Sequence, residues 1–112
     1  MSSFSNSPQW GGVATGRVRI LVTGVGGNVG QGILKALRAS GLASWVVGCD
    51  CHPLSVGLFA VDRGYVVPPA PHSSFAHVLA EILIQEKIQL VLVGADAETL
   101  AISRLRDSLQ QR

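Results

Sequence analysis

A cluster of glycines is the feature of this sequence best suited to chemistry. Five glycines fall within nine positions, from Gly24 to Gly32, after an apolar run and before a helical pattern. Glycine permits positive φ and the close approach of backbone to a ligand, and the N–H groups that open a helix attract phosphate or carboxylate. The loop therefore predicts an anion site, and the alternative is a tight turn that binds nothing. The candidate ligand-binding residues in it are Gly24, Gly26, Gly27, Asn28 and Gly30.

Acidic residues follow two of the apolar runs. Asp50 lies about twenty residues past the glycine loop, where an acidic residue holds the ribose hydroxyls in many dinucleotide sites. An equally good interpretation is an aspartate that caps the turn at His52 and Pro53. The loop itself reads G-x-x-G-x-x-G, whereas many dinucleotide sites read G-x-G-x-x-G. Asp96 follows the last apolar run, where it is most simply a helix N-cap, although its position also faces the expected cleft.

The remaining reactive residues form no convincing catalytic group. Cys49, Cys51 and His52 lack a fourth ligand and the usual spacing of a metal site, so we expect free thiols and no bound metal. Tyr65 is the single tyrosine and has no lysine four residues further on, as a short-chain dehydrogenase would need. We therefore assign no catalytic residue.

Alternating elements position these residues. Periodicity predicts strands at 17–23, 44–50, 63–67 and 88–93, helices at 28–40, about 74–87 and 96–109, and a helical turn from Pro53 to about Phe59. Strands that alternate with helices pair in parallel and carry helices on both faces. We expect an α/β fold, a Rossmann-like three-layer sandwich with a parallel sheet of four or slightly more strands, in the order 3-2-1-4. Ligands bind outside the carboxyl ends of such strands.

Composition bounds the class of protein. The chain has 112 residues, 47% hydrophobic and 14% charged, which is typical of one globular domain. Residues 1–16, rich in Ser, Asn, Gly and Pro, are predicted to form a flexible arm, and residues 17–112 the domain. A net charge of +2 without a basic stripe argues against nucleic acid. The sequence has no apolar run of membrane-spanning length and no secretory signal pattern, so we expect a cytoplasmic protein.

Three segments resemble a known family. "ILVTGVGGNVGQGILKALR", "VVGCDCHPLSVGLFAVDRGYVVPPA" and "KIQLVLVGADAETLAIS" are similar to the N-terminal, pre-ATP-grasp domain of ATP-grasp ligases, in particular carbamoyl-phosphate synthase large-subunit-like proteins. The resemblance implies a module that forms one wall of an active-site cleft. Such enzymes use ATP and Mg²⁺ to activate a carboxylate as an acyl phosphate, which a nucleophile attacks. The positions that match are 24–30, Asp50 with Pro53, Asp62 with Arg63, and 94–98.

The resemblance implies a non-catalytic substrate- or nucleotide-cleft module of a carboxylate ligase, as a fragment or a stand-alone protein. In this family ATP and Mg²⁺ are held by grasp domains beyond Arg112, so we expect no cofactor in this chain and no complete reaction from it. Expected partners are C-terminal ATP-grasp domains or a separate chain, and a second copy, because open sheet edges favour a homodimer. The alternatives are an NAD(P)-type dinucleotide-binding module of an oxidoreductase and a self-associating domain without a small ligand.

Overall fold

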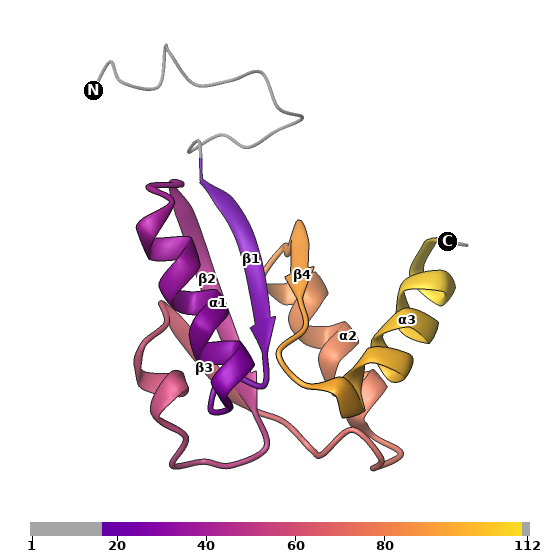
Figure 1. The fold of residues 1–112 in the computed structure, drawn as a ribbon. Coiled ribbons are helices and arrows are strands. Elements are labelled where there is room, and N and C mark those ends of the chain that lie inside the picture. The colour runs from indigo at the N-terminus through magenta and orange to yellow at the C-terminus, as the bar shows by residue number, and fades with distance from the viewer. Residues whose placement is uncertain (1–16, 111–112) are drawn as a thin grey trace.

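The computed structural model describes residues 17–110, and the predicted N-terminal arm lies outside the described residues. Four strands form one parallel sheet in the order β3-β2-β1-β4 (Figure 1). The order is the predicted one, and the α/β fold is confirmed. The strands are β1 (Val18–Thr23), β2 (Ser44–Asp50), β3 (Arg63–Val66) and β4 (Leu90–Leu92).

Helices lie on both faces of this sheet. Helix α1 covers one face, while α2 and α3 lie on the other, which gives three layers (Figure 1). A 3₁₀ turn, η2, replaces part of the helical turn predicted between β2 and β3. Apart from η2 and β4, the bounds agree with the predicted ones within two residues, whereas β4 is half as long as expected. The helices are α1 (Asn28–Ala39), η2 (Val56–Phe59), α2 (Phe75–Gln85) and α3 (Asp96–Gln110).

The central strand β1 divides the core into two parts. Side chains alternate across a strand, so Ile20 and Val22 face α1 while Leu21 faces α2. All three are fully buried. Because β1 and β2 are covered on both faces, they read as apolar runs rather than as alternating patterns. The sheet is therefore a rigid base for the loops at its two ends.

Two local expectations for the helices were wrong. The helical spacing of Val29, Ile33, Ala36 and Leu37 predicts the apolar face of α1. Ile33 and Leu37 pack on the core, but Val29 and Ala36 are exposed, and Gly30 and Leu34 are the buried residues. By residue type Ser73 or Ser74 is expected to cap α2, but Ser74, which stands at the N-cap, makes no side-chain cap, since its hydroxyl contacts the His72 ring at 2.8 Å.

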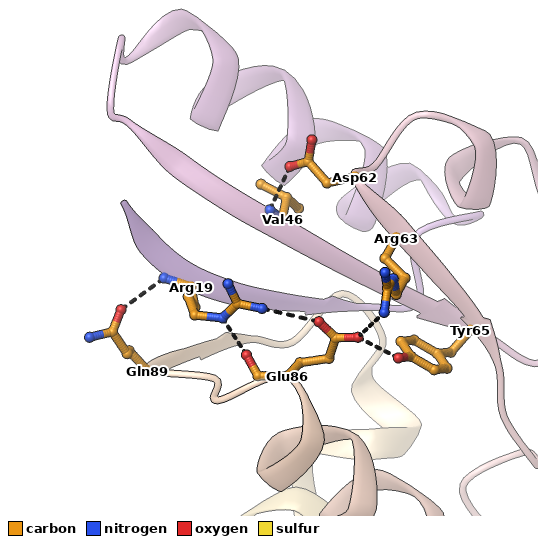
Figure 2. Close-up of polar contacts among 7 residues, drawn as sticks. All are labelled: Arg19, Val46, Asp62, Arg63, Tyr65, Glu86 and Gln89. Carbon is orange, nitrogen blue, oxygen red and sulfur yellow. Dashed lines mark hydrogen bonds and ion pairs between the residues drawn. The ribbon is translucent and has the colours of Figure 1, made fainter. Parts of the chain in front are cut away.

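A buried glutamate joins the elements at the edge where the strands begin (Figure 2). Glu86 follows α2 and is 3% exposed. Arg19 of β1 and Arg63 of β3 each contact its carboxylate at 3.2 Å, and the Tyr65 hydroxyl donates a hydrogen bond to it. Burial alone would raise the pKa of Glu86, but the Tyr65 hydrogen bond and the Arg63 charge outweigh burial and lower it. This Glu86 cluster fixes the α2–β4 connection to β1 and β3.

Candidate ligand-binding site at the glycine loop

A hollow of about 250 Å³ lies at the opposite edge of the sheet, where the strands end. The loop between β1 and α1 forms one wall, and the residues after β2 and β4 form others. Because parallel strands end at the same edge, residues far apart in sequence meet here. The lining includes Gly24, Gly27, Asp50, Cys51, Gly94 and Glu98, together with the segment 69–71.

The path of the turn requires glycine at two positions of the loop, in addition to Gly26, where a Cβ atom would lie 2.1 Å from the Ser55 Oγ atom. Gly24 has φ of +60°, a conformation that side chains disfavour. A Cβ atom on Gly30 would lie 2.2 Å from the Gly24 carbonyl oxygen, so no side chain fits between the turn and α1. These two glycines therefore have structural reasons that need no ligand.

Gly27 has no steric reason to be glycine. Its φ is −84°, and a Cβ atom there would meet the Gly24 carbonyl oxygen at an ordinary 3.6 Å. It is exposed, lines the hollow and forms the N-cap of α1 without a side-chain hydrogen bond. The first N–H groups of an α-helix have no acceptor within the helix. A glycine at this position leaves the N-terminal end of α1 open to the hollow.

Asp50 ties the loop to the end of β2. Its Oδ2 atom accepts a hydrogen bond from the Gly26 N–H at 2.7 Å, and its Oδ1 atom accepts one from the His52 N–H at 3.0 Å. The residue is 7% exposed. The bond to His52 agrees with the interpretation of Asp50 as a turn cap. The bond to Gly26 is a second role, which the sequence analysis did not predict. Two N–H groups thus already engage this carboxylate.

Glu98 brings an unpaired carboxyl oxygen to the hollow. The residue is 8% exposed, and its Oε1 atom has no hydrogen-bond partner among the described residues. The Thr23 hydroxyl hydrogen-bonds to the carboxyl group and also accepts the Gly94 N–H at 3.2 Å. Burial and the charge of Asp50 raise the pKa of Glu98, and the Thr23 hydrogen bond offsets only part of this. Glu98 therefore keeps a proton to higher pH than an ordinary glutamate.

The two cysteines have different environments, and both are free thiols. Cys49 is buried in the sheet, and burial, with the charges of Glu98 and Asp50, raises its thiol pKa. Cys51 is exposed and lines the hollow. Within residues 17–110, no group of three or more His, Cys, Asp or Glu side chains is placed to hold a metal ion.

The structure brings together most, but not all, of the predicted site residues. Gly24, Gly27 and Asp50 line the hollow, and Gly26 contacts Asp50. The side chain of Asn28 is exposed, and Gly30 is buried behind the turn.

Asp96, the predicted acidic residue after β4, is exposed and is not among the lining residues. Glu98 lies inside instead, in the first turn of α3, where its N–H bonds to the Ala95 carbonyl. Glu98 stands two residues after Asp96, so the sequence placed a second carboxylate near the predicted one. Which of the two enters the hollow depends on the rotation of α3 about its axis. Asp62 and Arg63 lie away from the hollow. Asp62 accepts the Val46 N–H at 2.7 Å, and Arg63 belongs to the Glu86 cluster (Figure 2).

Comparison with known proteins gives one family. Residues 20–112 match the family described as PylC-like, N-terminal domain. No curated protein sequence matches the chain at a significant level. Among the described residues, no helix has both the length and the apolar character needed to cross a membrane. The family match covers far more than half of the chain and includes every residue that lines the hollow. The chain belongs to the PylC-like N-terminal domain family, whose members are N-terminal domains of ATP-grasp ligases.

Proposed function

We propose that this chain is the non-catalytic N-terminal module of an ATP-grasp carboxylate ligase, and that its hollow faces the substrate or nucleotide of that enzyme. The observation that carries the proposal is the family match over residues 20–112. The location of the hollow supports it, since ligands of doubly wound sheets bind outside the carboxyl ends of the strands.

The size and lining of the hollow favour a small group. Its volume of about 250 Å³ is below the roughly 300–1,000 Å³ of pockets that enclose a whole small molecule. It suits one carboxylate or phosphate better than an entire dinucleotide. The buried, unpaired Oε1 atom of Glu98 is a reason to expect a ligand group, because buried polar atoms in proteins nearly always have a partner.

In this proposal the chain contributes binding and orientation. The N–H groups that open α1, beside Gly27, hold an anionic group, and the Glu98 carboxyl, whose pKa burial raises, donates a hydrogen bond to the same ligand when it carries its proton. The two N–H groups that engage Asp50 weaken its repulsion of an anion. ATP-driven formation of an acyl phosphate, as in carbamoyl-phosphate synthase-like enzymes, takes place on grasp domains. These domains hold ATP and Mg²⁺ and belong to the same polypeptide or to a partner chain.

The test is an NMR titration of the ¹⁵N-labelled chain with inorganic phosphate, with MgATP and with NAD, each alone. We expect weak binding of phosphate and MgATP that shifts the amide signals of Gly27 and Glu98, with no ATP hydrolysis and no preference for NAD. Weak binding follows from the small number of contacts that one helix end supplies.

The variant Asp50→Ala separates this function from its alternatives. Micromolar NAD binding that weakens tenfold or more in Asp50→Ala would identify an NAD(P)-type module, because a hydrogen bond to a charged group is worth roughly that factor. A chain that shows no shift with any of the three ligands and self-associates would be an interaction domain.

A further inference from the structure

A recess on the α1 face of the sheet lies apart from the glycine-loop hollow, at the edge where the strands begin. It has a volume of about 190 Å³ and lies between α1, the start of β2 and the segment that leads into β3. This volume is below the roughly 300 Å³ at which pockets begin to enclose a small molecule, so the recess suits a single side chain. Its aliphatic lining residues are Leu34, Leu37, Leu42, Val46, Ala60 and Val61.

The recess exists because the crossover between β2 and β3 contains little helix. Its only helical part is η2, a 3₁₀ turn of four residues, whereas the β1–β2 crossover contains the twelve residues of α1. Crossovers between parallel strands usually pack a full helix on the sheet. Ser44 and Val46, at the start of β2, are therefore only half-buried. This part of the sheet has room for a further apolar group.

Two charged side chains hold the rim of the recess in place. Arg38 of α1 donates a hydrogen bond to the Ala60 carbonyl, which ties the helix to the segment after η2. Asp62 accepts the Val46 N–H at 2.7 Å, and its own N–H bonds to the Val46 carbonyl at 2.9 Å. A guanidinium group packs favourably on an aromatic ring, and a carboxylate accepts several hydrogen bonds. The rim therefore suits an aromatic ring that carries an N–H donor.

The start of β1 lies beside this recess. Val18 pairs with Ser44, which lines the recess, and the Val18 N–H bonds to the Ala43 carbonyl at 3.0 Å. The side chain of Val18 packs against the same core cluster as that of Val46. Helix α1 ends at the edge of the sheet where β1 begins (Figure 1). The polypeptide that precedes Val18 therefore joins the sheet next to the recess.

The sequence of residues 1–16 has the composition of a segment that makes contacts. It contains no charged side chain and two of the chain's six aromatic residues, Phe4 and Trp10, whereas segments without contacts are usually charged and poor in aromatic residues. Three of the six residues after Trp10 are glycine, which lets the backbone turn back. The eight residues from Trp10 to Val18 can span about 26 Å, and neighbouring strands are only about 4.8 Å apart. Trp10 can therefore reach the recess.

We propose that the recess receives the Trp10 side chain of this chain's own N-terminal segment. The indole ring packs on the aliphatic walls beside Arg38, and its N–H group donates a hydrogen bond to the Asp62 carboxylate. Phe4 is the weaker candidate because a phenyl ring has no donor for that carboxylate. A tethered side chain is present at an effective concentration on the order of millimolar, so even weak contacts hold it in place. The inference stands whatever the glycine-loop hollow binds.

Two other occupants fit the recess less well. Polypeptide that leaves α3 starts on the α2 face of the sheet and outside β4, whereas the recess lies over β2 on the α1 face (Figure 1). A second copy of the chain would have to insert a side chain without the advantage of a tether. The N-terminal segment is the nearest polypeptide and already contains a side chain of the right chemistry.

The test is nuclear Overhauser spectroscopy of the full chain, with Trp10→Ser and Phe4→Ser as matched variants. We expect cross-peaks between the Trp10 ring and the methyl groups of Leu37, Leu42 and Val46. The amide signals of these three residues should shift in Trp10→Ser and stay in place in Phe4→Ser. We also expect the Trp10 indole N–H to exchange with water at least about tenfold more slowly than in the urea-unfolded chain.

A substitution in the recess distinguishes docking from a non-specific contact. Leu42 is 42% exposed, so Leu42→Glu should fold, as should the control Leu100→Glu on α3, where the side chain is 61% exposed. Leu42→Glu should abolish the slow indole exchange, and Leu100→Glu should keep it, while both retain the circular dichroism of the parent chain.

Three outcomes would overturn the proposal. One is the absence of cross-peaks from the Trp10 ring to the recess, and another is slow indole exchange that survives Leu42→Glu. The third is a set of cross-peaks that joins labelled to unlabelled copies in a mixed sample, together with a dimer in sedimentation velocity. That result would identify the N-terminal segment of a second copy as the occupant.

Discussion

The carboxylate of Asp50 accepts a hydrogen bond from the Gly26 N–H at 2.7 Å, so the end of β2 holds the loop that follows β1. A side chain at position 26 would displace this bond, since a Cβ atom there would lie 2.8 Å from the same oxygen. This hydrogen bond joins β1 and β2 beyond the end of their backbone ladder, at the edge of the sheet where the hollow forms.

Replacing Asp50 should cost stability even without ligand. Asp50→Ala leaves the N–H groups of Gly26 and His52 without their acceptor, and each loss of this kind costs about 1–3 kcal/mol. We expect the free energy of unfolding in urea to fall by about 2–3 kcal/mol, and by less in Asp50→Asn, which keeps one acceptor. An unchanged unfolding free energy in Asp50→Ala would contradict the structural role of the carboxylate.

Gly27 and Gly30 offer a matched pair of substitutions to alanine. Gly30→Ala places a Cβ atom 2.2 Å from the Gly24 carbonyl oxygen and should destabilise the fold by about 1–3 kcal/mol. Gly27→Ala meets no close atom and should leave the unfolding free energy within about 0.5 kcal/mol. If the hollow binds an anion, Gly27→Ala should nevertheless reduce the phosphate-induced shifts. Thermal unfolding and the phosphate titration check both variants, and unchanged phosphate shifts in Gly27→Ala would remove Gly27 from the site.

Glu98 should make the protein less stable as the pH rises. Its folded-state pKa is raised above the ordinary value of 4.5, so the folded state binds more protons than the unfolded state between these two pKa values. Stability therefore falls as the pH increases above about 4.5, and the loss is complete above the folded-state pKa. Glu98→Gln removes the charge and should unfold at a higher urea concentration than the parent chain at pH 8, with little difference at pH 4.

Glu81→Gln is the control for Glu98, since the side chain of Glu81 is 66% exposed. It should leave the pH profile of unfolding nearly unchanged. If Glu98→Gln also leaves the profile unchanged, the carboxyl group is solvated and its unpaired oxygen does not mark a ligand position.

Much of this fold could be predicted because local and long-range signals agree. The β-branched run ending at Gly24, the helical pattern after Asn28 and the apolar segment ending at Asp50 each define one element. Alternation of strands and helices then leaves few topologies. The shortened β4 was not predictable from residue types, because the apolar stretch 88–93 is longer than the strand. Ladder length depends on the partner strand, which a local pattern does not describe.

The candidate site was less predictable than the fold. Glycine spacing predicted the position of the loop. Why glycine stands at Gly24, Gly27 and Gly30 differs from one position to the next and depends on distances to other segments. The choice of Glu98 over Asp96 depends on the rotation of α3 about its axis, and both acidic residues suit the first turn of a helix. The Glu86 cluster joins residues up to 67 positions apart and left no motif in the sequence. Such contacts arise from packing, which the periodicity of one element does not specify.

The stabilising contribution of the Glu86 cluster should be lost as the pH falls, whereas that of Glu98 is lost as the pH rises. The folded-state pKa of Glu86 is lowered below 4.5, so its contribution is present above about pH 4.5 and is lost as the pH falls through the folded-state value. Glu86→Ala should lower the unfolding free energy at pH 7 by about 2 kcal/mol, less than for a fully enclosed ion pair because Arg19 and Arg63 reach solvent.

Tyr65→Phe removes one donor and keeps both arginines, so it should cost less than Glu86→Ala and raise the midpoint pH of acid unfolding. Urea unfolding at pH 7 and pH 3 measures both variants. A Glu86→Ala protein that loses the same free energy at both pH values would show that the side chain contributes packing rather than charge.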